Sequence, residues 1–179
     1  MSFETESMFD TEFGHEDVLE INDEYLQVRL GEMENGEIFT GKPQLTGINT
    51  IEFEDEDADG NPIYNEDGEA QMKKIHRLRL IINNDDEEQY LDININLKSD
   101  SLVVKNIRKG SVLFDFISSI HELENAGSTK GQNIIKSANL QQYIDFINSL
   151  KVIAVKNVER KGTYHFNSFY VVQVNNKKL

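Results

Sequence analysis

The fold class is decided by one stretch of the chain, KIHRLRLIINNDDEEQYLDININL at residues 74–97. Apolar and polar residues alternate over 74–82 and again over 91–97, which is the period-two pattern of half-buried β-strands. The polar run at 83–88 separates the two strands and predicts a hairpin turn. The residues expected to face the core are Leu78, Leu80, Ile82, Leu91, Ile93, Ile95 and Leu97. Those expected on the opposite face are Ile75, Arg77, Arg79, Ile81, Tyr90, Asp92, Asn94 and Asn96.

Further β-strands are predicted on both sides of this hairpin. Apolar residues alternate, or β-branched residues accumulate, in four more segments, at 25–30, 46–53, 151–158 and 164–174. In the stretch between the first two, turn-forming residues interrupt the pattern at Gly31, Gly36 and Gly41-Lys42-Pro43. Another turn is predicted at 159–162, and no internal repeat is apparent.

Two amphipathic helices are predicted between residues 111 and 150. Ser111 is placed as the N-cap of the first helix, apolar residues recur at helical spacing after it, and Gly127 ends it. Asn139 is placed as the cap of the second helix, whose apolar face runs to Leu150.

The predicted order is therefore strand, strand, strand, two helices, strand, strand, with one extra strand in front. This is a mainly β fold with a helical insert, and its order matches the five-stranded OB barrel, whose exposed face and loops commonly bind oligonucleotides or oligosaccharides. Other small β-barrels and α+β sheets have the same order. The expected domains are an acidic flexible tail at 1–24 and a single OB-like β-barrel at 25–179, with an acidic loop at 54–71 and a helical insert at 111–150.

Charge divides the chain into two parts. Residues 1–70 contain 21 of the 32 acidic side chains and two basic ones, whereas residues 71–179 contain 16 basic and 11 acidic side chains. The formal net charge is −14, yet the second part carries an excess of positive charge that suits a polyanion. The first part has the charge to repel a polyanion or to imitate one.

Several absences narrow the function. The chain has no cysteine, which excludes disulfides, thiolate metal sites and a cysteine nucleophile and suits a reducing compartment. No apolar run approaches the ~20 residues of a membrane helix, and the N-terminus lacks the pattern of a secretory signal. Glycine-rich phosphate loops, nucleophile elbows and HExxH motifs do not occur, so nothing argues for an enzyme. We expect a cytoplasmic protein, in the host cytoplasm if it is viral, with no cofactor and no membrane contact.

The C-terminal half has a layout of its own. It begins with KNIRKGS at 105–111, continues through the helices at 112–124 and 139–150, and ends in a strand containing YHFNSFY at 164–170. This layout resembles the single-stranded-DNA-binding OB proteins of bacteriophage replication modules. The resemblance covers about half of the chain and implies binding of single-stranded DNA without sequence preference. The chain departs from that pattern because its acidic tail is N-terminal and its first long loop is acidic.

A surface for single strands needs cations beside the phosphates and flat rings against the bases. The candidate nucleic-acid-binding residues, which an OB topology would bring together, are Arg77, Arg79, Tyr90, Lys98, Lys105, Arg108, Lys109, Lys156, Arg160, Lys161, Tyr164, Phe166 and Tyr170. For any one of them alone, a solvated strand face or a core position is the commoner role. Phe166 and Tyr170 share a strand face with Val172 and Val174, so core packing is an open alternative for both rings.

The acidic loop matches part of a calcium-binding pattern. Oxygen ligands at alternate positions around a glycine are typical of such loops, and the matching residues here are Asp55, Asp57, Asp59 and Glu66. The flanking segments are predicted strands where a calcium loop has helices. A solvated turn region containing Asp-Gly and Asn-Pro is the commoner explanation, and no metal is expected.

These observations favour a non-sequence-specific single-stranded-DNA-binding protein of a phage-type replication or recombination module. The acidic tail would then compete for the groove or recruit replication or recombination proteins. The alternative is an acidic protein that imitates DNA and docks on, or inhibits, a basic partner. The sequence determines neither self-association nor a preference for DNA over RNA.

Overall fold

The computed structural model describes residues 19–97, 111–125, 140–162 and 165–178. Within them the chain forms seven strands, two α-helices and one 3₁₀ turn, η3 (Leu30–Glu32). The strands are β1 (Leu26–Arg29), β2 (Ile38–Glu54), β3 (Met72–Asn84), β4 (Gln89–Leu97), β5 (Ile153–Lys161), β6 (His165–Val174) and β7 (Lys177–Lys178). The helices are α2 (Val112–Asn125) and α4 (Leu140–Asn148). None of the helices in these residues is long and apolar enough to cross a membrane.

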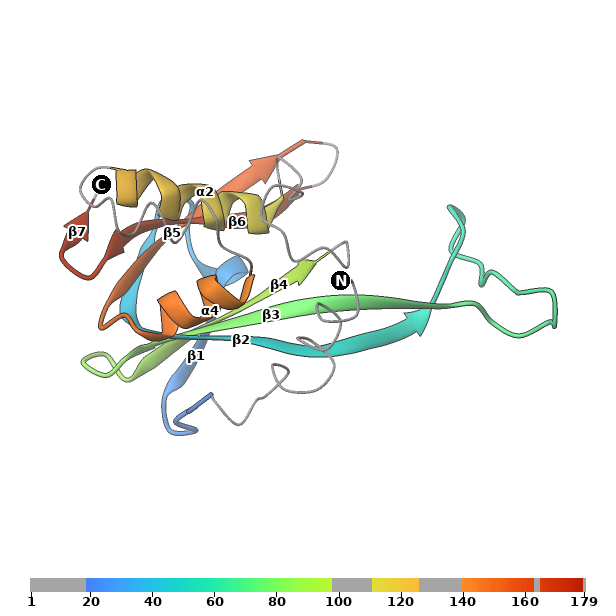
Figure 1. Ribbon diagram of the computed structural model, residues 1–179, viewed down its shortest axis with the longest axis horizontal. Helices are drawn as coiled ribbons and strands as arrows, with labels where there is room; N and C mark the ends of the chain where they lie inside the picture. The colour runs from blue at the N-terminus through green and yellow to red at the C-terminus, as the bar shows by residue number, and fades with distance from the viewer. Residues whose placement is uncertain (1–18, 98–110, 126–139, 163–164, 179) are drawn as a thin grey trace.

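The strands form one mixed sheet that is not closed into a barrel. Its order is β1-β4-β3-β2-β5-β6-β7, in which β1 runs parallel to β4 and every other neighbouring pair is antiparallel. The mainly β class with a helical insert is therefore confirmed. Figure 1 shows α2 and α4 over the sheet, with β5 and β6 curving around behind them.

Strand β2 joins the two halves of the sheet. Residues Ile38–Gly41 pair with β5, and the pairing with β3 starts at Lys42. At this crossover the strands are so close that a Cβ on Gly41 would collide with the carbonyl of Asn83. The prediction that Gly41-Lys42-Pro43 interrupts the segment is wrong, because β2 continues through these residues and the glycine permits close strand approach.

Pro43 is tolerated in β2 because the strand has an open edge there. The backbone of Leu45, two residues on, points away from β3, and the side chain of Asn148 on α4 binds it twice. Leu45 N–H donates to Asn148 Oδ1 at 2.6 Å, and Asn148 Nδ2 donates to the Leu45 carbonyl at 2.8 Å. The nitrogen of Pro43 points to the same side as that of Leu45, so its missing N–H costs no ladder hydrogen bond.

The core lies between the inner face of the sheet and the two helices. The predicted inward residues of β3 and β4 are buried there, except that the side chain of Leu97 lies outside the described residues. Phe116 of α2 packs on Phe169 of β6 with ring centroids 5.3 Å apart. Ser111 caps α2 as predicted, since its Oγ accepts a hydrogen bond from Phe114 N–H at 3.0 Å. The predicted cap Asn139 and helix end Gly127 lie outside the described residues.

Helix α2 covers the edge of β6 that would otherwise be unpaired. The Oγ of Ser119 accepts a hydrogen bond from Val171 N–H at 2.9 Å, and α2 also contacts β4. The helix thus fills the opening between β4 and β6, which do not pair in the described part of the chain. Covering an exposed edge in this way suppresses pairing with another chain.

Beyond the body, β2 and β3 continue as a two-stranded arm that ends in the acidic segment 54–71 (Figure 1). At the tip, the N–H of Asp55 donates to Gln71, that of Gln71 to Ile63, and that of Ile63 to Asp55, a closed ring of three backbone hydrogen bonds. Two small turns branch from this ring. They repeat at a spacing of eight residues, from Asp57 and from Asn65, so the expectation of no internal repeat is wrong at this short scale.

Candidate nucleic-acid interface

The face of the sheet opposite the core, called here the outer face, carries mostly polar side chains. The alternation of β-strand side chains places on it Gln27, Arg29, Gln44, Thr46, Arg77, Arg79, Ile81, Asn83, Tyr90, Asp92, Asn94 and Asn96. Arginines from β1 and β3 therefore lie on the same face as the amides of β4. The arginines on this outer face differ in the side chains that hold them.

Arg79 is held by a carboxylate. Its Nε and Nη2 lie 3.1 Å and 3.0 Å from the two carboxylate oxygens of Asp92, and Gln27 Nε2 donates to the same carboxylate at 2.8 Å. The side chain of Asp92 is 7% exposed and that of Arg79 is 20% exposed. The charge of Arg79 is therefore largely balanced inside the protein, which the sequence did not predict.

Arg77 is held by a neutral amide. Its Nε donates to Asn96 Oδ1 at 3.0 Å, directly across the strand pair. No other hydrogen bond or ion pair of Arg77 is found within the described residues. Arg77 thus keeps its full charge on a partly exposed face.

Arg29 joins this face although the sequence analysis did not select it. It is exposed at the end of β1 and lies beside Asp92, because β1 pairs in parallel with β4. Parallel pairing between two strands about 60 residues apart leaves no local sequence signal. Tyr90, by contrast, is a predicted stacking ring, but it is only 9% exposed, so its ring offers little surface to a base.

The predicted cations and rings of β5 and β6 form a separate group. Arg160 lies against Asp115 of α2, with Nη2 to Oδ1 at 2.6 Å and Nε to Oδ2 at 3.1 Å. Its guanidinium also stands 5.7 Å from the centre of the Tyr170 ring. The hydrogen bonds that Arg160 donates to Asp115 raise the pKa of Arg160, and burial raises the pKa of Tyr170.

Ser168 belongs to the same hydrogen-bond network as Arg160 and Asp115. Its hydroxyl donates to Asp115 at 2.6 Å, and both side chains are almost fully buried. The expected common face of Phe166 and Tyr170 with Val172 and Val174 is interrupted, because the pairing of β5 with β6 shifts register after Ala154. Within this group Phe166 is half-buried, Lys156 is half-buried and Lys161 is exposed.

The predicted cations of β3 and β5 are held by different elements. Arg160 is tied to Asp115 of α2, whereas Arg77 and Arg79 are held by Asn96 and Asp92 of β4. That an OB topology would bring these cations together on one surface stays a prediction. Five further candidates lie outside the described residues, namely Lys98, Lys105, Arg108, Lys109 and Tyr164.

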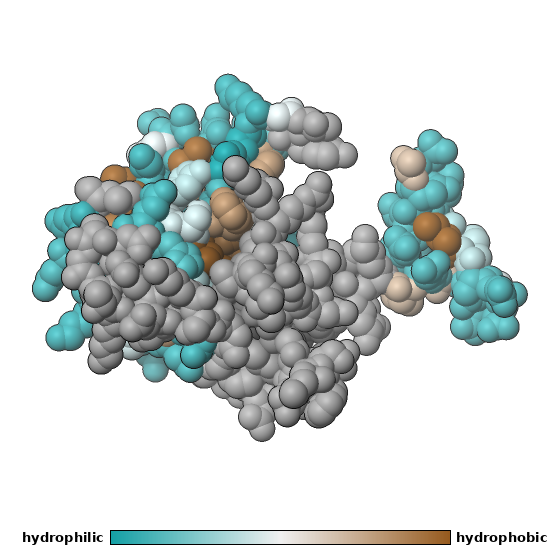
Figure 2. All heavy atoms as spheres, turned by 45° about the horizontal axis from the view of Figure 1, so that its top comes forward, coloured by the Kyte–Doolittle hydropathy of each residue, from teal (hydrophilic) through white to brown (hydrophobic). Residues whose placement is uncertain are grey.

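The four candidate calcium ligands are spread over the tip of the arm. Asp55 lies in the ring of backbone hydrogen bonds, Asp57 and Asp59 in the first turn and Glu66 in the second. Asp57 Oδ1 already accepts the N–H groups of Asp59 and Asn61, at 2.9 Å and 3.0 Å. Among the described residues no three acidic or histidine side chains are placed to hold a metal ion. The tip is mostly hydrophilic in Figure 2, with Tyr64 63% exposed.

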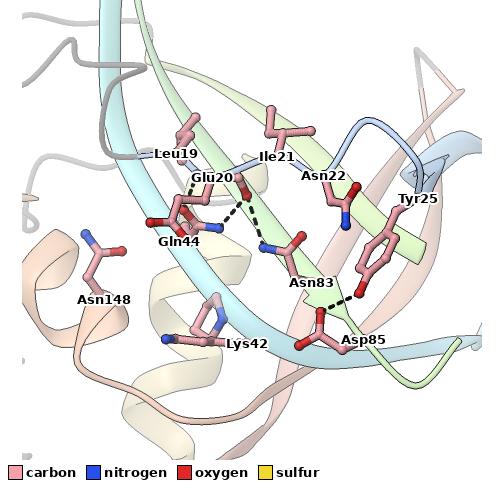
Figure 3. A pocket seen from close by; sticks show the side chains of 11 residues that line it. Leu19, Glu20, Ile21, Asn22, Tyr25, Lys42, Gln44, Asn83, Asp85 and Asn148 are labelled. Carbon is pink, nitrogen blue, oxygen red and sulfur yellow. Dashed lines mark hydrogen bonds between the residues drawn. The ribbon is translucent and has the colours of Figure 1, made fainter. Parts of the chain in front are cut away.

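A cavity of about 930 Å³ opens where the N-terminal segment crosses the edge of the outer face. Figure 3 shows Glu20 lying against Gln44 and Asn83. The N–H of Glu20 donates to Gln44 Oε1 at 2.6 Å, and its carbonyl accepts from Gln44 Nε2 at 3.0 Å and from Asn83 Nδ2 at 3.4 Å. The end of the predicted flexible tail, residues 19–24, is therefore attached to the sheet. Tyr25 donates to Asp85, which raises the pKa of that tyrosine.

Comparison with models of known protein families gave no match, and comparison with curated proteins gave none.

Proposed function

We propose that the protein binds single-stranded DNA, without sequence specificity, across the outer face of β3 and β4, as part of a phage-type replication or recombination module. The strand succession supports this proposal. Strands β2, β3 and β4 follow one another, a helical segment intervenes, and β5 and β6 return to pair on the other side of β2. An OB barrel opened between β4 and β6 has this arrangement.

The observation that carries the proposal is the composition of the outer face. In an OB barrel the face of the second and third strands binds oligonucleotides, and β3 and β4 occupy those positions in the chain. In the described part of the chain, Arg29 and Arg77 stand there without an ion pair, beside Arg79, which Asp92 holds. The amides of Asn94 and Asn96 add donors and acceptors for phosphates or base edges.

Binding to a fluorescent 20-nucleotide oligo-dT at low salt tests the proposal, with a duplex of the same length for comparison. We expect the single strand to bind more tightly than the duplex. The variant Arg29→Gln/Arg77→Gln should lose about tenfold or more in affinity, since each charge-assisted hydrogen bond contributes about 1.5–3 kcal/mol. The control Lys151→Gln/Lys178→Gln removes the same charge near β7 and should stay within about twofold of wild type. Equal losses in both variants would contradict the proposed surface.

The proposal includes competition by the acidic N-terminus. Residues 1–18 contain six carboxylates and no basic residue, and the segment after them is bound at the edge of the outer face by Gln44. Gln44→Leu, which loosens this attachment, should raise oligo-dT affinity about threefold, because a tethered competitor acts at high effective concentration. Gln173→Leu on β6 is the control. Unchanged affinity in Gln44→Leu across salt concentrations would remove the competition.

A second candidate function follows from the arm. Residues 54–71 carry eight carboxylates and no basic side chain, and most of them are exposed on a projecting hairpin. Such a surface suits a basic partner that otherwise binds DNA. Absence of oligonucleotide binding at low salt, together with stoichiometric binding of a defined lysine-rich peptide that depends on these carboxylates, would favour this second function.

A further inference from the structure

Two arginines stand on the same face of β3, two residues apart, and their partners differ in charge. Arg77 donates from Nε to the amide oxygen of Asn96 at 3.0 Å. Arg79 makes two hydrogen bonds to the carboxylate of Asp92, at 3.1 Å and 3.0 Å. Both partners come from β4, so the same strand sets the electrostatic state of both guanidinium groups.

Asp92, the partner of Arg79, makes this arginine a poor ligand for a phosphate. Its bidentate ion pair is mostly shielded, since the side chain of Asp92 is 7% exposed, and Gln27 of β1 adds a third hydrogen bond to the carboxylate. Taking Arg79 away from Asp92 would leave a poorly hydrated carboxylate with one amide donor. Breaking such a pair is strongly unfavourable, so a phosphate gains little by recruiting Arg79.

The partner of Arg77 has the opposite effect. Asn96 fixes the Nε side of the guanidinium without neutralising its charge, and within the described residues Arg77 makes no further hydrogen bond or ion pair. The terminal Nη1 and Nη2 groups then form a planar fork with a set orientation. Such a fork matches two oxygens of a phosphate, and a lysine ammonium in its place does not.

We propose that Arg77 is the phosphate-binding arginine of the outer face and Asn96 its positioning residue, while Asp92 withholds Arg79 from the ligand. This inference rests on the proposed function and names the residues that carry it. It makes the two neighbouring arginines unequal, although sequence alone gives them equal weight.

Affinity for a fluorescent oligo-dT, measured as a function of salt in the full chain, tests this assignment. Arg77→Lys keeps the charge but loses the fork, so affinity should fall about tenfold while the slope of log affinity against log salt stays close to wild type. Removal of the Arg79 pair by Arg79→Leu/Asp92→Leu should leave affinity within about twofold. A tenfold loss in the double variant, or no loss in Arg77→Lys, would overturn the assignment.

The positioning role of Asn96 is tested by replacing its amide with a carboxylate, the group that Asp92 presents to Arg79. Asn96→Asp places a carboxylate against Arg77 and should reduce affinity at least tenfold. Asn94→Asp adds the same charge on the same face of the same strand, in register with Arg79, and should reduce affinity about threefold or less. Asn96→Ala, which removes only the orienting contact, should lose about threefold. Equal effects of Asn94→Asp and Asn96→Asp would overturn the positioning role.

The outcomes separate this inference from the proposed function. If the wild type binds no oligo-dT at low salt, the proposed function fails, and the assignment of Arg77 fails with it. If the wild type binds and Arg77→Lys binds equally well, the proposed function stands and the assignment fails. Thermal unfolding of each variant, followed by circular dichroism, identifies any loss that comes from misfolding. Substitution at exposed Asn94 and Asn96 should change the folding stability little.

Discussion

At the scale of single residues, Asp115 holds α2 against the closing strands. It is almost fully buried and accepts hydrogen bonds from Arg160 and Ser168. Asp115→Asn removes the charge and part of this hydrogen bonding. We expect the free energy of unfolding in urea to fall by about 1–2 kcal/mol, toward the lower end of values for charged hydrogen bonds because Arg160 is 36% exposed and can be hydrated.

The control for Asp115 is Glu122→Gln on the exposed side of the same helix. It makes the same chemical change without buried partners and should alter the unfolding free energy by less than about 0.5 kcal/mol. Equal effects at the two positions would contradict a structural role for the Asp115 network.

Tyr143 should make stability depend on alkaline pH. Its ring is buried, its hydroxyl lies 3.0 Å from His121 Nε2, and burial raises its pKa well above the ordinary value of 10.0. The neutral form is therefore favoured in the folded state. The stabilisation is fully present below pH 10 and is lost as pH rises toward the folded-state pKa. Between pH 10 and 11 the wild type should lose about 1 kcal/mol more than Tyr143→Phe.

Urea unfolding at several pH values above 9 measures this difference. Tyr64→Phe, whose ring is 63% exposed on the arm, is the control and should follow the wild type. Parallel pH profiles for wild type and Tyr143→Phe would show that the ionisation of Tyr143 is not linked to folding.

At the scale of elements, the crossover in β2 is the most constrained point of the sheet. Gly41→Ala would press a methyl group into the backbone of Asn83, which cannot move without disturbing β3. We expect a loss of about 2–3 kcal/mol in unfolding free energy, or failure to fold. Gly162→Ala, with nothing within 4 Å of the added carbon, should be close to neutral in the same thermal or urea measurement. Similar stabilities of the two variants would contradict the crossover geometry.

Local pattern was sufficient for the elements whose side chains alternate or repeat. The hairpin of β3 and β4 and the start of α2 at Ser111 were predictable, because one face of each is buried. The first part of β2 was not predictable. Gly41 permits the close approach of Asn83, and Pro43 is tolerated because the strand edge there is open, and both conditions depend on residues far away in the sequence. The last strand was predicted, but its register shift moved the expected face of Val172 and Val174.

The candidate site was also predictable in part, because the alternation of side chains in β3 and β4 shows which residues share a face. The sequence placed Arg77, Arg79 and Asp92 on one face, and a four-residue turn at 85–88 fixes the register that sets Arg77 opposite Asn96. The diagonal pairing of Arg79 with Asp92 and the arrival of Arg29 beside them required the positions of β1 and β4. The pairing of Arg160 with Asp115 required the position of α2.

At the scale of the whole molecule, acidic and basic side chains lie on different parts of the fold. The acidic segment 54–71 stands away from the body on the arm, while the uncompensated arginines of the outer face lie on the sheet itself. Among the described residues, no carboxylate of the arm forms an ion pair with an arginine of the outer face. The positive charge of the uncompensated arginines is therefore available to a polyanion that approaches this face. Binding of a nucleic-acid backbone should therefore be governed by a few outer-face cations and be sensitive to salt.

The salt dependence of oligo-dT binding tests this account most directly. For single strands, each neutralised phosphate contributes about −0.7 to the slope of log affinity against log salt. We predict measurable binding at low salt and a slope near −1.5 or steeper, which becomes less steep by about 1.4 in Arg29→Gln/Arg77→Gln. Absence of binding at low salt, or a slope unchanged in that double variant, would contradict the account.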